Sequence, residues 1–241
     1  MRPTRTILLT LAALAASVLD GASAPALAAP QLVVFGDSYS LTLRDGVRDW
    51  PALLQEQRLA GRIANFAKSG TTAATRSGPD FAKAIHRWEQ AGRPLGDTVV
   101  YLGYLDIGGD LAKSRAGYQA GIDELVAAGA ASGRNRLFLV EPHDVGSMPL
   151  FNRTARRGYL RRQTEDWDGF VAYTAHHVGA APVDVFAAID RVLRDPRRYG
   201  FTNVTTVDRA HSATTALYRE PFHVGQHGQA IIARTIASRL R

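Results

Sequence analysis

The sequence contains no cysteine among its 241 residues. This absence excludes a disulfide framework, a thiolate metal site and a cysteine nucleophile, and it leaves serine, histidine, carboxylates and metals as means of catalysis. Lysine is also scarce, so nearly all of the positive charge is carried by arginine. Charged residues make up 21% of the chain and apolar residues 46%, which is ordinary for a globular protein. Disordered, collagen-like and coiled-coil chains are therefore excluded, and the length predicts one domain.

The formal net charge is +7 and the pI is about 10.0. Such a balance is compatible with three kinds of partner, namely nucleic acid, anionic lipid and acidic polysaccharide. The compartment of the protein decides among them.

The first 28 residues predict that the protein is exported. Arg2 and Arg5 precede an apolar run from Ile7 to Leu19, and the small-residue site Ala26–Ala28 follows. A basic flank, a short apolar core and an A-x-A site are typical of a secretory signal peptide, and the run is short for a membrane span. We therefore expect a signal peptide over residues 1–28 and a single domain over 29–241, in the periplasm or outside the cell. Cleavage removes two arginines and one aspartate, which changes the net charge of +7 to +6.

The rest of the chain repeats a short apolar run followed by a helical pattern. The predicted strands are Gln31–Phe35, Arg62–Phe66, Thr98–Leu102, Arg136–Val140 and Val183–Phe186. The predicted helices include one capped by Asp49 that runs to Leu59, and others over about 80–90, 111–131, 187–194 and 228–240. Continuous apolar strands that alternate with helices predict an α/β fold with a central parallel sheet covered on both faces. Ligands of such sheets bind beyond the carboxyl ends of the strands.

A serine follows the first predicted strand directly, in the sequence Phe35-Gly36-Asp37-Ser38-Tyr39-Ser40. A serine in an ordinary loop usually forms a turn. Here Gly36 permits a sharp exit from the strand, which would leave the Ser38 hydroxyl exposed at the edge of the sheet. The tetrad Gly-Asp-Ser-Tyr at a strand end resembles the first motif of the GDSL, or SGNH, hydrolases.

Two further blocks follow in the order of that family. The second strand leads into Asn65-Phe66-Ala67-Lys68-Ser69-Gly70, and the resemblance assigns the backbone N–H of Gly70 to an oxyanion hole together with that of Ser38. The third strand leads into Gly103-Tyr104-Leu105-Asp106, where the family has Gly-x-Asn-Asp. Leu105 therefore stands where an asparagine donor is expected, and loss of one such donor costs roughly 100- to 1000-fold in rate.

The last block lies near the C-terminus. The family pattern Asp-x-x-His corresponds here to Glu220-Pro221-Phe222-His223, with Gly228 five residues after the histidine. A single buried histidine is most often structural, but four blocks in order favour a catalytic role for His223. The resemblance makes Glu220 the residue that orients its ring, as glutamate does in some serine hydrolases of other folds.

The stretch Asp195–Thr205 resembles the NPxxYGFxNVT segment of the lecithinase and hemolysin branch of GDSL lipases. The resemblance then covers nearly the whole mature chain. It implies a three-layer αβα sandwich with about five parallel strands, as in SGNH hydrolases and flavodoxin-like proteins.

Three other groups of residues have alternative interpretations. His223 and His227 are four residues apart, as zinc ligands on a helix are, but Gly225 intervenes and no glutamate follows the first histidine. His176 and His177 are adjacent, so their side chains diverge on a helix. The run Arg153–Arg162 carries five arginines, which form either a solvated helix face or a surface attracted to anionic lipid or polysaccharide of the cell envelope.

These observations predict a secreted serine esterase or lipase that acts on an acyl lipid or an acetylated carbohydrate. Its catalytic residues are Ser38, His223 and Glu220, and neither a metal nor an organic cofactor is required. Export argues against nucleic acid as a partner. The departures at Leu105 and Glu220 keep two alternatives open, a non-catalytic SGNH-fold binding protein of the envelope and an acyltransferase.

Overall fold

The computed structural model describes residues 32–42, 46–208 and 215–241. A five-stranded sheet lies at its centre, in the order β2-β1-β3-β4-β5, and all neighbouring strands are parallel. The strands are β1 (Leu32–Gly36), β2 (Ile63–Asn65), β3 (Asp97–Tyr101), β4 (Leu137–Glu141) and β5 (Ala181–Asp184). β1 and β3 are buried along their whole length, which explains their apolar runs, Leu32–Phe35 and Val99–Tyr101. The strand order is that of flavodoxin-like folds.

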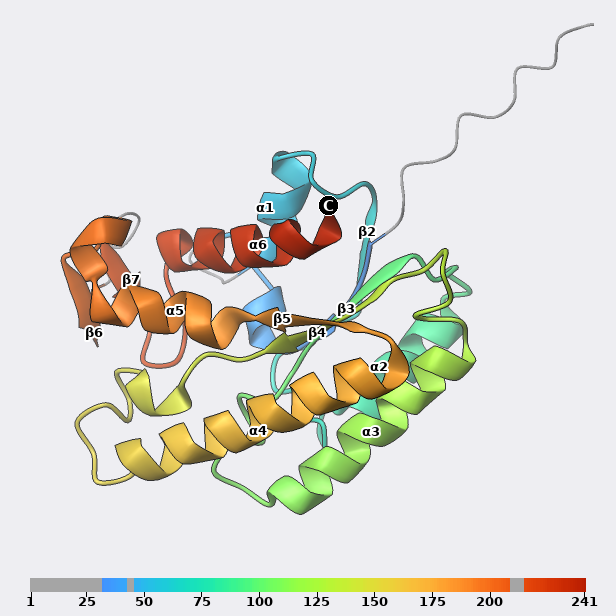
Figure 1. The fold of residues 1–241 in the computed structure, drawn as a ribbon, viewed down its shortest axis with the longest axis horizontal. Coiled ribbons are helices and arrows are strands. Elements are labelled where there is room, and N and C mark those ends of the chain that lie inside the picture. Colours follow the sequence, from blue (N-terminus) through green and yellow to red (C-terminus); the bar gives the residue numbers. More distant parts are fainter. Residues whose placement is uncertain (1–31, 43–45, 209–214) are drawn as a thin grey trace, which may run out of the picture.

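Within the described residues, six α-helices cover the two faces of the sheet. α1 and α6 lie on one face with α5 packed against α6, and α2, α3 and α4 lie on the other (Figure 1). The helices are α1 (Trp50–Glu56), α2 (Phe81–Gln90), α3 (Leu111–Ala127), α4 (Arg157–Val178), α5 (Val185–Arg194) and α6 (Gln226–Leu240). The three-layer αβα sandwich predicted from the sequence is therefore confirmed.

Aspartates begin four of these helices. The side chains of Asp49, Asp80, Asp110 and Asp184 each accept a hydrogen bond from the backbone N–H three residues later, at 2.6–3.2 Å. A cap of this kind stabilises a helix by about 1 kcal/mol. The cap predicted at Asp49, with Pro51 in the first turn, is confirmed.

Some boundaries differ from those predicted. The first helix ends at Glu56 and not at Leu59, because Arg58 adopts a left-handed conformation with φ 55°. The helix predicted to reach residue 131 ends at Ala127, two residues before Gly129, whose φ is 100°. The fifth strand lies two residues earlier than predicted, because the Asp184 side chain already caps α5.

A second, two-stranded sheet was not predicted. β6 (Asn203–Val207) pairs with β7 (Ala216–Tyr218), and a register irregularity separates their two paired positions. β6 is the Asn-Val-Thr segment that resembles the lipase branch. β7 leads directly into the loop that carries His223, so this small sheet positions one end of the site.

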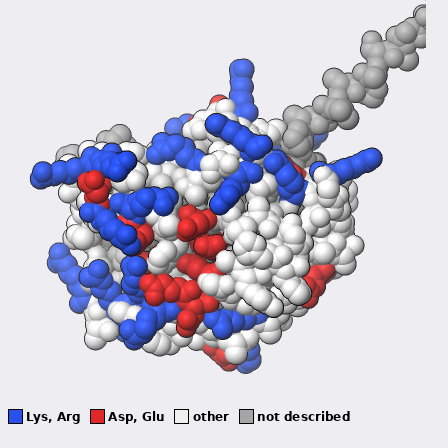
Figure 2. All heavy atoms as spheres, viewed as in Figure 1, with Lys and Arg blue, Asp and Glu red and all other residues white. Residues whose placement is uncertain are grey.

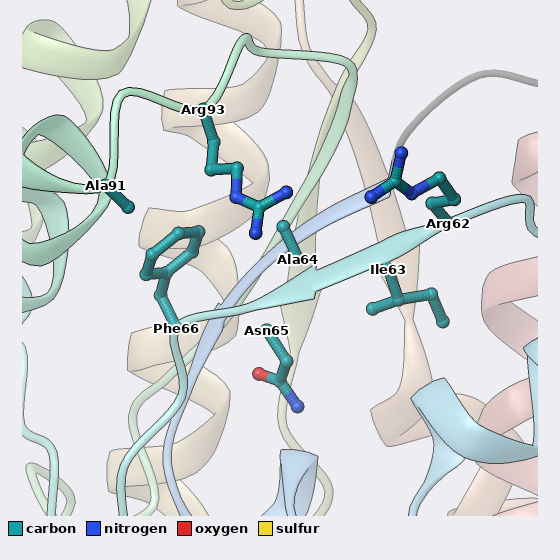
Figure 3. Close-up of a pocket in the computed structure, with 7 residues that line it drawn as sticks. All are labelled: Arg62, Ile63, Ala64, Asn65, Phe66, Ala91 and Arg93. Atoms are coloured by element: carbon teal, nitrogen blue, oxygen red, sulfur yellow. The ribbon is translucent and has the colours of Figure 1, made fainter. Parts of the chain in front are cut away.

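The edge strand β2 lies beside a cavity of about 330 Å³. Arg62 and Arg93 flank it, and the Arg93 side chain extends over β2 toward Ala64 (Figure 3). Neither arginine belongs to β2, but charged side chains beside an edge strand oppose its pairing with another chain. None of the predicted catalytic residues is among the residues that line this cavity.

The predicted signal peptide lies outside the described residues. Within the described ranges, every helix is too short or too polar to cross a membrane.

Candidate active site

The predicted site residues meet at the carboxyl edge of the sheet. Ser38 follows β1, Gly70 follows β2 and Leu105 follows β3, and these strands are adjacent and parallel. His223 reaches the same edge from the loop between β7 and α6. Ser38, Gly70, Leu105 and His223 line one cavity of about 390 Å³.

The turn after β1 presents the Ser38 side chain. A Cβ on Gly36 would lie 2.5 Å from Ser40 Oγ and 3.2 Å from the Tyr101 carbonyl oxygen, so only glycine permits this close packing. The Asp37 carboxylate accepts the Tyr39 N–H at 2.9 Å and caps the 3-10 turn Ser38–Ser40. Tyr39 and Ser40 are buried, whereas Ser38 is partly exposed toward the cavity.

Ser38, His223 and Glu220 form a continuous hydrogen-bonded chain. Ser38 Oγ lies 2.8 Å from His223 Nε2, and His223 Nδ1 lies 2.9 Å from Glu220 Oε2. With the Nδ1 proton donated to the carboxylate, Nε2 is free to accept the serine proton. This is the arrangement of nucleophile, base and orienting acid that acyl transfer requires, and it joins positions 185 residues apart.

Three hydrogen bonds fix the loop that carries His223. The Tyr39 hydroxyl donates to the Phe222 carbonyl, and the Leu150 N–H donates to the Pro221 carbonyl at 3.2 Å. The backbone of Arg219 donates to the His223 carbonyl at 3.0 Å. The Tyr39 ring also packs 5.3 Å from the His223 ring, so the residue after the candidate nucleophile also positions the base.

Glu220 takes the place of the aspartate without loss of contact with His223. Its side chain is 39% exposed and that of His223 is 16% exposed, so the pair lies at the rim of the cavity. Gly228 permits α6 to pack closely on this loop, since a Cβ there would lie 2.6 Å from Val224 Cβ.

Two backbone N–H groups are free to serve as oxyanion donors. Within the described residues, the N–H groups of Ser38 and Gly70 have no hydrogen-bond acceptor. Gly70 has φ 84°, a conformation that favours glycine, and Arg76 donates to its carbonyl oxygen. This contact fixes the peptide that follows Gly70, and Gly70 itself lines the cavity.

Leu105 supplies no third donor. Its side chain is 48% exposed and lines the cavity, at the position where the family has an asparagine. The neighbouring motif residues have structural contacts. Asp106 is buried and accepts the Ala73 N–H at 3.0 Å, which ties the turns after β2 and β3 together. Gly103 lies against the Trp167 indole, and any Cβ there would clash.

Asp37 lies behind the nucleophile and not beside the imidazole. Burial raises the pKa of Asp37 to about 7, and the charge of Asp106 adds to this rise. One of its carboxylate oxygens has no hydrogen-bond partner within the described residues. Its role is to cap the turn that carries Ser38.

His143 is a site residue that sequence reasoning missed. It follows β4 and is fully buried, and burial lowers its pKa to about 3. Its Nδ1 lies 2.5 Å from the Tyr104 hydroxyl, which lies 2.5 Å from that of Tyr101. The Tyr39 ring packs against both Tyr104 and His143. A neutral, hydrogen-bonded cluster therefore supports Tyr39, and through it His223.

The cavity wall is largely apolar, and most of its residues could not be singled out from sequence. They come from the turns after β3 and β4, from the start of α4 and from the His223 loop. The apolar lining residues are Leu105, Ile107, Val145, Met148, Phe151, Leu160 and Phe222.

The other histidines lie apart from this chain of contacts. His223 precedes α6 and His227 lies within it, where its ring stacks on Phe201 at 4.5 Å. The two therefore do not share a helical face as a zinc pair would. His177 stacks on Tyr173 in α4. In the described part of the chain, no cluster of three or more potential metal-ligating side chains occurs.

The arginine run divides into residues with different surroundings. Arg161 contacts Asp144, Glu165 and Asp190 at 2.9–3.3 Å. On the face that carries α4 and α5, acidic side chains gather in a central band with lysines and arginines around it (Figure 2). Four of the five are exposed, as a solvated helix face requires, namely Arg153, Arg156, Arg157 and Arg162. Arg156 also lines the cavity. Attraction to an anionic surface stays a prediction.

Similar structures include two enzymes. LAE5, described as an alpha/beta hydrolase enzyme from the metagenome of Lake Arreo, Spain, is 21% identical over 88% of this chain and 94% of its own, with a TM-score of 0.60. Axe2, an acetylxylan esterase from Geobacillus stearothermophilus, is 19% identical over the same shares, with a TM-score of 0.57. At such low identity the likeness shows the fold alone.

Among the sequence comparisons, a family model matches the chain and the search of curated proteins does not. No curated protein matches the chain. The family model described as "SGNH domain (fused to AT3 domains)" matches residues 10–238. The match confirms the SGNH resemblance, and the assignment to the lecithinase and hemolysin branch stays a prediction.

Proposed function

Because the chain belongs to the SGNH domain family, we propose that it is a serine esterase that cleaves carboxylic esters through an acyl-enzyme intermediate. One observation carries the proposal, the unbroken chain from Ser38 Oγ through His223 to Glu220, with contacts of 2.8 and 2.9 Å. Its position beside an apolar cavity at the carboxyl edge of the sheet supports the same conclusion.

The reaction has two halves. Ser38 Oγ attacks the ester carbonyl while His223 Nε2 takes its proton, and the imidazolium then protonates the departing alcohol. Water, deprotonated by the same nitrogen, attacks the acyl-serine and releases the acid. Glu220 holds the Nδ1 proton and stabilises the imidazolium in both halves.

The N–H groups of Ser38 and Gly70 donate hydrogen bonds to the negatively charged oxygen of the tetrahedral intermediate. Preorganised donors of this kind usually make the largest electrostatic contribution to such a reaction. With Leu105 in place of the third donor, we expect a working but slow enzyme.

The cavity and the similar enzymes suggest the substrate class. An apolar wall and a volume of about 390 Å³ suit an acyl group of short to medium length. Axe2 is an acetylxylan esterase, which favours acetylated carbohydrate, whereas the resemblance of Asp195–Thr205 favours an acyl lipid. Both substrates are encountered by an exported protein, and export after cleavage at Ala28 is part of the proposal.

Labelling with a fluorophosphonate probe, followed by a screen of p-nitrophenyl esters from acetate to palmitate, tests the proposal. We expect covalent labelling at Ser38 and faster turnover of the short esters than of palmitate. Acetylated xylan and phosphatidylcholine in the same screen separate the two substrate classes. A folded protein that neither labels nor hydrolyses any ester is the non-catalytic envelope protein instead.

Restoring the missing donor should accelerate the reaction. We expect Leu105→Asn to raise kcat for p-nitrophenyl acetate by about tenfold or more, because an added amide donor stabilises the transition state and not the ground state. Leu105 is half exposed, so the replacement should leave the melting temperature nearly unchanged.

Leu105→Ala is the matched control for this change. It removes the same apolar bulk without adding a donor, so its kcat should stay near that of the wild type. Equal acceleration in both variants would show that Leu105 acts by obstruction, and no gain in Leu105→Asn would mean that another group already occupies the donor position.

A further inference from the structure

An arginine lies among the residues that line the proposed catalytic cavity. Arg156 immediately precedes α4 and lines the same cavity as Ser38 and His223. Among the described residues that line it, Arg156 is the only lysine or arginine, and the surrounding wall is mostly apolar. A substrate that fills the cavity therefore meets one positive charge.

Two contacts hold the guanidinium there. Its Cζ lies 5.8 Å from the centroid of the Phe151 ring, which is within cation–π range. A Cβ on Gly108 would lie 3.2 Å from Arg156 Nη2, so the guanidinium rests against the turn that follows Leu105 and Asp106. It is thus placed on the wall where the acyl-transfer centre lacks its third donor.

No carboxylate of the described residues pairs with this guanidinium. Arg161, five residues later, contacts three carboxylates, whereas no ion pair of Arg156 occurs in the described ranges. A ligand that covered Arg156 without offering an acceptor would remove water from a charged group at a net cost. An anionic group on the ligand would replace that water with charge-assisted hydrogen bonds.

We propose that Arg156 selects esters that carry a negative charge, a carboxylate or a phosphate, close to the scissile bond. This inference rests on the proposed esterase function and names the substrate class within it. The planar guanidinium suits bidentate contact with either anion, and the apolar wall accommodates the rest of the ester. Arg156 determines substrate specificity, whereas Ser38 and His223 carry out the reaction.

The test compares matched pairs of anionic and neutral esters. For charge on the acyl side, the pair is the 4-nitrophenyl monoester of adipic acid and 4-nitrophenyl hexanoate. For charge on the alcohol side, the pair is 4-acetoxybenzoate and its methyl ester. The measured quantity is the ratio of kcat/KM for the anionic ester to that for its neutral partner, in the wild type, Arg156→Gln and Arg156→Lys.

We expect the ratio to fall by about tenfold in Arg156→Gln for at least one pair, which is the effect of losing one charge-assisted hydrogen bond. Arg156→Lys should keep part of the ratio, since the charge remains but the planar group that makes two parallel hydrogen bonds is lost. In the wild type the ratio should also fall as ionic strength rises from about 0.05 M to about 0.5 M. The pair of esters whose ratio falls in Arg156→Gln shows whether the anion lies on the acyl or the alcohol side of the scissile bond.

Arg153→Gln is the matched control. Arg153 belongs to the same exposed run but lines other pockets. Its replacement changes the net charge by the same amount and should leave the ratio unchanged. A ratio that stays constant in Arg156→Gln overturns the proposal, and so does an equal fall in Arg153→Gln, which would indicate long-range attraction alone. Equal loss on both members of a pair would assign Arg156 to the oxyanion instead. If the wild type hydrolyses none of the four esters and does not label with fluorophosphonate, the proposed function itself fails.

Discussion

Ser38→Ala is expected to lower kcat/KM for p-nitrophenyl acetate by about 10⁴-fold or more, because the variant lacks the hydroxyl that lies 2.8 Å from His223 Nε2 and would form the acyl intermediate. Labelling by fluorophosphonate should disappear in the same variant. The Ser38 hydroxyl is partly exposed and contacts only His223 among the described side chains, so its removal should cost about 1 kcal/mol or less of stability. Enzyme assays, mass spectrometry of the labelled protein and thermal unfolding measure these three quantities.

Ser40→Ala provides the matched control for this prediction. Ser40 lies two residues later in the same turn, but its buried hydroxyl accepts the Trp50 indole N–H at 3.1 Å and does not face the imidazole. We expect Ser40→Ala to lose about 1–3 kcal/mol of stability and to keep its labelling. Ester turnover by Ser38→Ala at a tenth of the wild-type rate or more would refute the assigned nucleophile.

Glu220→Gln is expected to lower kcat by roughly 100- to 10,000-fold with little change in the folded structure. The amide can donate to His223 Nδ1, which would place the imidazole proton on Nε2, where it faces Ser38 and blocks proton transfer. The neutral amide also fails to stabilise the imidazolium. Since the Glu220 side chain is 39% exposed, water partly replaces the lost charge, and we expect the lower half of that range.

Glu89→Gln is the control for loss of charge from a His–Glu pair. Glu89 lies 3.5 Å from His86 on α2, both side chains are exposed, and neither residue is among those that line the cavity. Its kcat should stay within about twofold of the wild type, as expected for an exposed ion pair. If Glu220→Gln retains more than half of its activity, the imidazole is oriented by Tyr39 and the loop backbone, and Glu220 is not part of the mechanism.

Glutamate in place of aspartate was one of two departures from the family pattern, together with Leu105, and its extra methylene requires a shift of the loop. The structure places the Glu220 carboxylate 2.9 Å from His223 Nδ1, in a loop held by hydrogen bonds from the Tyr39 hydroxyl and the Leu150 N–H. Such a loop path depends on contacts with β7, α6 and the turn after β1. A local sequence pattern cannot predict those contacts.

No local sequence pattern identified two other residues of the site. His143 lies in a short Pro-His-Asp segment, and only its burial against Tyr104 and Tyr39 identifies it as a support of the site. Arg156 looked like one member of a solvated arginine run. Its place in the cavity follows from the start of α4 meeting the turn at Gly108.

The sequence by itself determined the layered α/β fold and the turn at Ser38, because these depend on apolar periodicity and on glycine and aspartate at strand ends. The partners of that serine followed from the resemblance of short motifs to those of the SGNH family. Those features are local, and each acts through the few residues beside it. Only the tertiary structure decided that Ser38 and His223 lie 2.8 Å apart, that Leu105 faces the cavity and that Arg156 joins it. These are contacts between segments up to 185 residues apart, and they are set by how the layers pack.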